Sequence, residues 1–512
     1  MNATSPKREL SRTQLLMISF AAIFGSGWLF SPLYAAQIAG PYALAAWGIG
    51  AIISMIIGVT MAEVVVLYPK AGGLSPVVRE THGDFLSLLL TIFNLVVFII
   101  LPAIEVRAVL QYLSTYLKSA ALPEGLSVTF ETALAFMLLA LVTLVNLYGA
   151  RITAAITRVV VFFKLFTPIL VCVAFASALG SEKMTDMTRL SFSPTHSGSV
   201  PWTEIFQAIA TSGIIFSFNG FNQATLFAGE AKNPKRAIPF AILGSLIVSG
   251  LLYLAIQYVL IMAIPQTSLV NGWKNISFPG DDGPFAGLSI ALGLGGLLTV
   301  IYIDAVISPL GTAFSYASAA PRLLYSLGEI KLNRHGVSPT AFLGAFFLEC
   351  LAFILLPNLK AMIALLVAAF VLCYTVAPAS LLVLRKTQPK LHRPFRVKWA
   401  PLACYLSISF SNLMVFSCGW IALRNLALFS GGVLTLYLAF LVKKKQKQEI
   451  QSTLQGSGWF LFQIFSLGIL SFYHQKSALD FGWISFSIAA LSWFALLLAT
   501  RVTPQDGLIS AR

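Results

Sequence analysis

Long apolar runs divided by short polar loops dominate this sequence. Of its 512 residues, 57% are hydrophobic and only 10% are charged, whereas a soluble globular domain carries about 25% charged residues. About fourteen segments approach the roughly 20 apolar residues that cross a bilayer as a helix, and the run at 341–356 is the most marginal of them. The pattern predicts an all-α integral membrane protein.

The net charge of +15 comes from basic residues placed between the apolar runs. Cytoplasmic loops of membrane proteins collect Lys and Arg. With the N-terminus in the cytoplasm, most basic residues fall on that same side, which predicts a protein of the cytoplasmic (inner) membrane with both termini inside the cell. No basic stripe indicates nucleic acid as a partner. The five cysteines form no Cys-x-x-Cys pair, so neither a metal site nor a disulfide framework is expected.

The first span contains the string IFGSGWLFSP at 23–32. Gly25 and Gly27 flank Ser26 in mid-membrane, and Pro32 follows. Gly costs about 1 kcal/mol and Pro about 3 kcal/mol in a helix interior. The span is therefore expected to unwind here, and unwound backbone at membrane depth is tolerated where it lines a protein cavity.

The sixth span carries a second interruption, because Gly220 lies between Asn219 and Asn222 near its middle. Two interrupted spans in corresponding positions indicate the halves of an inverted repeat. The expected organisation is a ten-helix transporter core at 13–384, built of repeats 13–179 and 201–384, then helices 11 and 12 at 401–442 and two additional C-terminal helices at 457–500.

A broken helix exposes N–H groups at one new end and C=O groups at the other. The N–H end suits a carboxylate and the C=O end suits an ammonium group, so paired breaks favour a site for a zwitterionic small molecule. The alternative is close helix packing through small residues. Gly50, Ser54 and Gly58 of the second span have that spacing without a nearby proline, and they predict packing alone.

Some ionisable residues lie inside predicted spans, where buried charge is costly and marks candidate functional sites. Lys164 is a candidate proton carrier or a fixed substitute for a sodium ion, unless it snorkels to the interface. Glu105, near the outer end of the third span beside Arg107, is a candidate for proton coupling; it is expected to line an outer vestibule or to form a satisfied ion pair. Asp304, in mid-span, is a candidate for proton coupling or for an ion-pair partner.

Several strings resemble the amino acid–polyamine–cation (APC) superfamily of permeases, over roughly residues 13–442. They are the 23–32 string, Tyr68-Pro69 with Gly72-Gly73, and GEAKNPKRAIP at 229–239. The chain is most similar to the bacterial aspartate–proton symporter subgroup, through AIFGSGWLF at 22–30, IEVRAVLQY at 104–112, Asp304-Ala305 with Ser308-Pro309, and HRPF at 392–395. The resemblance implies the LeuT-like fold of 5+5 inverted repeats, with broken helices 1 and 6 and extra C-terminal spans.

The resemblance also implies roles for residues at the two breaks. The substrate α-carboxylate would be held by Gly25, Ser26 and Gly27, and the α-ammonium group by carbonyls of Ile23, Phe216 and Asn219. Phe216 and Phe218 would cover the site, while Asn222 and Gln223 would face the substrate side chain. Lys164 matches a fifth-helix lysine of the family, which lies at the place where sodium-coupled relatives bind sodium.

These observations together predict a secondary transporter that imports an amino acid by proton symport, with an acidic amino acid such as aspartate as a candidate substrate. The alternatives are an amino acid exchanger without ion coupling and a non-transporting sensor. Glu230 and Arg236 could form an inner gate or merely belong to a charged loop. No Walker loop or other enzyme signature is present, so neither catalysis nor a cofactor is expected.

Overall fold

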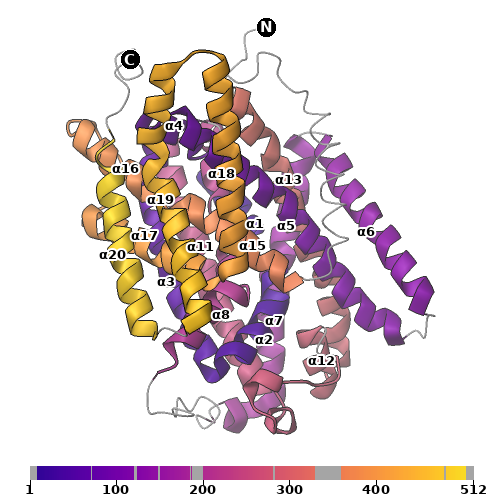
Figure 1. Cartoon of the computed structure of the whole chain (residues 1–512). Coiled ribbons are helices and arrows are strands. Elements are labelled where there is room, and N and C mark those ends of the chain that lie inside the picture. The colour runs from indigo at the N-terminus through magenta and orange to yellow at the C-terminus, as the bar shows by residue number, and fades with distance from the viewer. Residues whose placement is uncertain are drawn as a thin grey trace.

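The structure, a computed structural model, describes residues 8–70, 72–119, 124–147, 150–184, 186, 200–280, 283–328, 359–477 and 480–502. Within these ranges the chain is helical, with a single isolated β-bridge and no strand (Figure 1). Ten helical segments of the described residues are long and apolar enough to cross a membrane. The predicted all-α membrane class is confirmed, whereas the count of fourteen spans stays a prediction, and the segment 341–356 lies outside the described residues.

The first half of the chain forms the helices α1 to α7. Their bounds are α1 Arg12–Ile23, α2 Gly27–Ala39, α3 Ala43–Leu67, α4 Ser75–His82, α5 Asp84–Ser119, α6 Glu124–Leu147 and α7 Ala150–Met184.

The described remainder of the chain forms the helices from α8 onward. Their bounds are α8 Trp202–Thr211, α9 Ile214–Phe218, α10 Gln223–Leu226, α11 Pro234–Ala263, α12 Pro284–Ala291, α13 Gly295–Gly328, α15 Leu359–Tyr374, α16 Val376–Thr387, α17 Ala400–Ser417, α18 Trp420–Lys443, α19 Lys447–Ser477 and α20 Phe481–Ala499.

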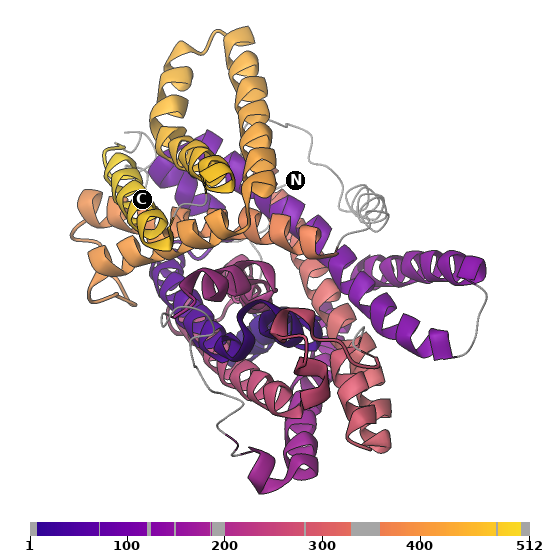
Figure 2. The same ribbon diagram turned by 60° about the horizontal axis from the view of Figure 1, so that its bottom comes forward.

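The helices run roughly along one axis (Figure 1). In the centre, α1 packs against α11 and α13, α11 packs on α3, and α13 packs on α5. The helix α6 lies at the periphery, away from the α18–α20 group, as the turned view shows (Figure 2). The broken helix α1 is thus surrounded by protein on several sides.

Small residues allow the close packing of α3. A Cβ atom added at Gly50 would come within 2.8 Å of Ile214, and one added at Gly58 would come within 2.9 Å of Ile242. The helices α9 and α11 therefore approach the α3 backbone directly, which confirms the packing face predicted from the small residues of this span.

Both predicted helix breaks are present. In the first span, α1 ends at Ile23 and α2 begins at Gly27. Pro32 lies inside α2 and not at the break, so the glycine–serine–glycine step alone coincides with the unwound residues. The sixth span is divided into α8, α9 and α10, and Gly213 and Gly220 take positive φ values of 99° and 129° at the two interruptions. An L-residue with a side chain adopts this backbone region at a cost, which is why glycine stands there.

Candidate functional site

Three of the backbone groups that the first break frees bind side chains. A continuous helix would pair the carbonyl of Ala21 with residue 25 and the amide of Ser26 with residue 22. Instead, the ammonium of Lys164 donates to the Ala21 carbonyl at 2.5 Å, and the Ser26 amide donates to Oε2 of Glu105 at 2.8 Å. The Ile23 carbonyl accepts from the hydroxyl of Tyr253 at 3.2 Å.

Lys164 and Thr312 stabilise the end of α1 by side-chain hydrogen bonds. The Lys164 ammonium also donates to Oγ1 of Thr312 at 2.6 Å, and that hydroxyl lies 3.2 Å from the Ala21 carbonyl. Lys164 is fully buried, so it does not snorkel to an interface, and its charge is directed at main-chain and hydroxyl oxygens. The predicted charge in the fifth span therefore lies directly against the broken first span.

Glu105 lies at the first break and not in an outer vestibule, which differs from the sequence expectation. Its carboxylate is fully buried, and Oε1 has no hydrogen-bond partner. A Cβ atom added at Gly25 would collide with Oε1 of Glu105 and come within 2.7 Å of the Thr312 hydroxyl. Glycine is required here because the carboxylate and the backbone come so close together.

The second break lies against the first. A Cβ atom added at Gly220 would come within 2.5 Å of the Ala22 carbonyl carbon and of the Ile23 amide. Tyr253 of α11 joins the two spans, since its hydroxyl also lies 3.0 Å from the carbonyl of Ser217. Two chain segments almost two hundred residues apart in sequence therefore meet through their unwound backbones.

The second break also carries three buried carboxamides. Asn219 accepts a 2.5 Å hydrogen bond at Oδ1 from the hydroxyl of Tyr374, at the end of α15. Atoms without a partner remain on all three: Nδ2 of Asn219, Oδ1 of Asn222, and both Oε1 and Nε2 of Gln223. Buried polar groups in native proteins are nearly always hydrogen-bonded, so these atoms are available to water or to a polar ligand.

Other residues predicted for the site are placed differently. Phe216 is buried beside the break, whereas the ring of Phe218 packs against Trp47 and Tyr253, with centroids 5.8 and 5.3 Å away. Asp304 is fully buried in α13 and accepts from Ser308 at 2.8 Å. Its carboxylate lies within electrostatic range of Lys164 and close to the side chain of Trp28, which follows the first break in α2.

The segment around Glu230 pairs with the N-terminal segment. The amide of Leu10 donates to the Glu230 carbonyl, and the amide of Lys232 donates to the Leu10 carbonyl, each at 2.9 Å. The structure thus joins the start of the first span to the segment that follows the sixth span. Arg236 lies in the first turn of α11, adjacent to this junction.

Sequence reasoning missed Tyr253, Thr312 and Tyr374, although all three contact the breaks. Each one is a hydroxyl-bearing residue within an apolar run. A polar side chain at membrane depth needs a partner, and that signal could have drawn attention to them. Among the described residues, no group of three or more His, Cys, Asp or Glu side chains could hold a metal ion.

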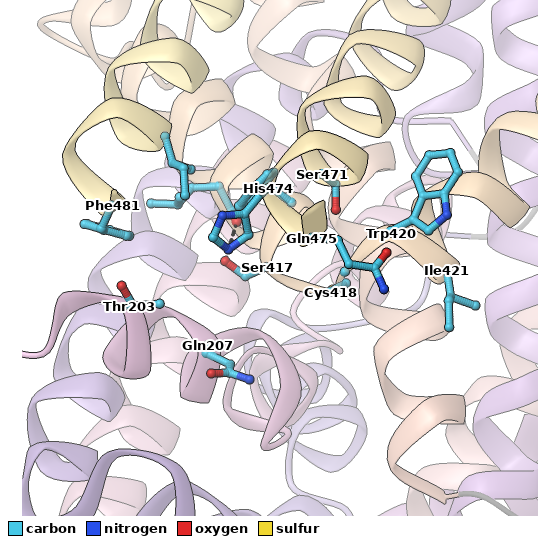
Figure 3. Close-up of a pocket in the computed structure, with 14 residues that line it drawn as sticks. Thr203, Gln207, Ser417, Cys418, Trp420, Ile421, Ser471, His474, Gln475 and Phe481 are labelled. Carbon is cyan, nitrogen blue, oxygen red and sulfur yellow. Dashed lines mark hydrogen bonds between the residues drawn. The ribbon is translucent and has the colours of Figure 1, made fainter. Parts of the chain in front are cut away.

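Cavities bordered by described residues lie near these elements. A small one, of about 20 Å³, is bordered by Asn222 and Tyr374. A larger one, of about 410 Å³, lies between α8 and the helices α17 to α20 (Figure 3), where Thr203, Gln207, Ser417, His474 and Gln475 surround it. No residue of either helix break lines the larger cavity, so its size alone does not make it the substrate site.

Comparisons with known proteins agree with this geometry. The profile of the family described as "Amino acid permease" matches residues 10–441. The glutamate/serine transporter AimA of Bacillus subtilis is 28% identical over 95% of this chain and 92% of its own length. The aspartate-proton symporter of the same organism is 29% identical over 91% of this chain and 90% of its own length.

Among solved structures, a mutant of the manganese transporter of Eremococcus coleocola superposes with a TM-score of 0.52 at 13% identity, over 90% of this chain and 94% of its own. This likeness supports the LeuT-like fold. The family and the relatives are transporters and not enzymes, and the relatives identify the chain as a multi-pass protein of the cell membrane. The chain therefore belongs to the amino acid permease family of the APC superfamily.

Proposed function

We propose that the chain imports an amino acid together with protons, through the site formed where its two helix breaks meet. Amino acid transport follows from the family; the site, the coupling ion and the direction are the proposal. The observation that carries it is the hydrogen bond from the Ser26 amide to the buried carboxylate of Glu105. In that bond the broken helix binds a carboxylate group with a freed main-chain N–H.

The substrate carboxylate would bind the same N–H groups, those of Gly25, Ser26 and Gly27. At the N-terminus of α2 the amides of Ser26 and Gly27 have no intrahelical acceptor, and the helix dipole adds partial positive charge. The Gly25 amide donates to the Ile23 carbonyl at 3.1 Å and would exchange that bond for the substrate. The ammonium group would bind carbonyls at the opposite ends of the breaks, those of Ile23, Phe216 and Asn219. Both ends of a zwitterion are then held by main-chain groups.

Proton coupling would follow from competition at the Ser26 amide. A substrate carboxylate and an ionised Glu105 cannot share one N–H in a buried site, because two adjacent anions repel strongly at low dielectric. Protonation of Glu105 removes the conflict and releases the amide. The other groups facing Glu105 are the ammonium of Lys164 and the hydroxyls of Tyr253 and Tyr316.

Lys164 and Asp304 would complete the coupling network. While protonated, Lys164 holds the Ala21 carbonyl and so fixes the end of α1, and Asp304 offers a second buried carboxylate within its field. Loss of the proton from Lys164 would weaken its hold on α1 and allow the broken span to move. Protonation of Glu105 and loss of the proton from Lys164 each change the net charge of the site by one unit.

Access from the cytoplasm would be controlled where Leu10 pairs with the segment around Glu230. With both termini inside the cell, the backbone bonds of this segment close the inner end of the two broken spans. Glu230 and Arg236 belong to this inner gate, and the gate opens as the bundle rocks around the site.

Uptake by purified protein in proteoliposomes tests the proposal. With labelled serine, aspartate and glutamate outside empty vesicles, we expect at least one to accumulate when the outside is more acidic, and a protonophore to abolish accumulation. Uptake that requires unlabelled amino acid inside the vesicle would instead establish exchange. Uptake that ignores the proton gradient would remove the coupling claim, and binding without any flux would favour a sensor.

A further inference from the structure

Basic side chains gather where α16, α17 and α20 pack against one another (Figure 1). The chain has no Asp or Glu between residues 385 and 402. The end of α20 joins this segment, because the ammonium of Lys386 donates to the carbonyl of Thr500 at 3.2 Å. We define the basic patch as the exposed Lys and Arg residues of these elements, which are Lys386, Lys390, Arg396, Lys398 and Arg501.

A buried carboxylate holds the segment that carries the patch. Glu63 of α3 is buried, and it binds Arg385 at 2.7 Å and the amide of Val397 at 2.6 Å. Arg393 lies 3.4 Å from the same carboxylate. Arg385 and Arg393 offset the charge of Glu63, and in the described part of the chain no carboxylate forms an ion pair with a residue of the patch. The patch is therefore a preorganised group of positive charges.

Exposed apolar side chains adjoin the patch. Trp399, which precedes α17, is 79% exposed, and Leu402 in the first turn of α17 is also exposed. Trp493 and Leu497 are exposed near the end of α20. The ring of Tyr405 in α17 lies 5.7 Å from that of Trp493, so the two helices form one surface. Tryptophan is enriched at the boundary between membrane and water, and Trp399 marks that boundary beside the patch.

The combination of charge and apolar surface selects an amphipathic anion. A soluble anion such as phosphate would use the charges alone, whereas an anionic phospholipid would contact both parts. Basic clusters at the ends of membrane helices bind such headgroups. The general excess of Lys and Arg in cytoplasmic loops accounts for positive charge here, but not for the buried anchor of the segment or for the contribution of α20.

We propose that the basic patch binds the headgroup of an anionic phospholipid, whose acyl chains lie along the exposed surface of α17 and α20. The inference is independent of the substrate and of the coupling proton. It gives the last span a role, because α20 supplies Arg501 and the Thr500 carbonyl that holds Lys386. A bound lipid would join α20 to the segment between α16 and α17 and stabilise the folded protein.

Thermal unfolding of the purified full-length protein in a neutral detergent tests the proposal. The additives are phosphatidylglycerol, phosphatidylcholine with the same acyl chains, and glycerol 3-phosphate, which carries negative charge without acyl chains. A ligand that binds the native state raises its melting temperature. We expect phosphatidylglycerol alone to raise it, and the rise to shrink when NaCl increases from about 0.1 to 0.5 M. Equal shifts with the two lipids, or an equal shift with glycerol 3-phosphate, would overturn the inference.

A triple variant assigns the lipid to the patch. Lys390→Gln/Arg396→Gln/Lys398→Gln removes three exposed charges and leaves the Glu63 anchor intact. The concentration of phosphatidylglycerol that gives half of the maximal stabilisation should rise at least about tenfold. Arg501→Gln should produce a smaller rise, because it removes one charge. An unchanged concentration in both variants would overturn the assignment.

The matched control removes the same charge elsewhere. Lys443→Gln/Lys445→Gln/Lys447→Gln neutralises three exposed lysines around the connection between α18 and α19. This variant should respond to phosphatidylglycerol at the same concentration as the wild type. A loss equal to that of the patch variant would show that the lipid responds to the net charge of the protein and would overturn the site.

Discussion

The backbone amide of Ser26 and the carboxylate of Glu105 are joined by a 2.8 Å hydrogen bond across a broken membrane helix. The two residues are 79 positions apart in sequence, and both are buried. In this arrangement an internal carboxylate occupies the main-chain group that the proposed mechanism reserves for the substrate carboxylate. Substrate binding and Glu105 ionisation are therefore expected to exclude each other.

Glu105→Gln tests that exclusion. If a proton on Glu105 must accompany the substrate, the affinity of the wild type for serine should fall by about tenfold for each unit of rising pH in the range where Glu105 is ionised. The variant is permanently neutral, so its affinity should be high and independent of pH, and it should not accumulate substrate against a gradient. Dissociation constants measured between about pH 5.5 and 8.5 provide the check.

The matched control for this experiment is Glu204→Gln, because Glu204 is exposed on α8. The control should keep the pH dependence of the wild type. A Glu105→Gln variant that retained the same pH slope would show that the coupling proton binds elsewhere, and Lys164 and Asp304 would be examined next.

The contact between the two breaks makes Gly220 intolerant of any side chain. Its φ is 129°, and a Cβ atom would come within 2.5 Å of the α1 backbone. We expect Gly220→Ala to destabilise the protein by more than about 1 kcal/mol and to abolish uptake. Thermal unfolding in detergent and uptake assays measure the two effects.

Gly48→Ala is the comparison, because Gly48 lies in helix α3 with no atom within 4 Å of the added Cβ. That substitution should stabilise the helix by up to about 1 kcal/mol. Equal stability and equal uptake of Gly220→Ala and Gly48→Ala would contradict the close contact between the breaks.

Glu63 is a fully buried anchor for the segment between α16 and α17. Arg385 binds its carboxylate with two hydrogen bonds of 3.0 and 2.7 Å, and the amide of Val397 adds a third at 2.6 Å. Arg393 lies 3.4 Å away. Removing one partner of a buried charge pair costs about 3–5 kcal/mol. Because Arg385 is partly exposed, we expect Glu63→Gln to lower the free energy of unfolding by about 3 kcal/mol, the low end of that range.

Arg79→Gln provides the contrast in the same thermal unfolding experiment. The pair of Arg79 and Asp84 spans 2.8 Å but is partly exposed on both sides, and exposed pairs contribute about 0–1 kcal/mol. If Glu63→Gln lowered the free energy of unfolding by less than Arg79→Gln, the buried cluster around Glu63 would not anchor the segment between α16 and α17.

His82 makes stability depend on pH. It follows the second span outside the membrane-spanning segments, and burial lowers its pKa from 6.5 to about 3. The folded protein keeps the imidazole neutral, whereas the unfolded chain binds a proton below pH 6.5. Stability should therefore fall by about 1.4 kcal/mol per unit as the pH drops below about 6.5, and this contribution should be constant above that value.

The comparison of His82→Gln with His392→Gln isolates this effect, since His392 is exposed. Melting temperatures at about pH 7.5, 6.0 and 5.0 should show a weaker pH dependence for His82→Gln and an unchanged one for His392→Gln. Identical pH dependence in all three proteins would assign the acid sensitivity to other groups.

Local sequence features predicted where the helices break but not what the breaks contact. Gly25, Ser26 and Gly220 have weak helix propensity, which is a property of neighbouring residues alone. Lys164 was identifiable because a charge in an apolar run is costly wherever its partner lies. These signals are local, so they can be read without knowledge of the fold.

The contacts themselves depend on how distant helices face one another. Apolar runs indicate which segments cross the membrane but not the rotation of each helix about its axis. Glu105 was therefore expected in a vestibule, and Tyr374, 155 residues from Asn219, was not expected at the site at all. Close approach through small residues fixes these rotations.

The most direct test is an experimental structure of the protein determined with L-serine bound. The account predicts ligand density between Ser26 and Asn219, with the α-carboxylate on the Ser26 amide and Glu105 displaced from that amide. Ligand density in the larger cavity near His474, or a Glu105 that still accepts from the Ser26 amide while the amino acid is bound, would contradict it.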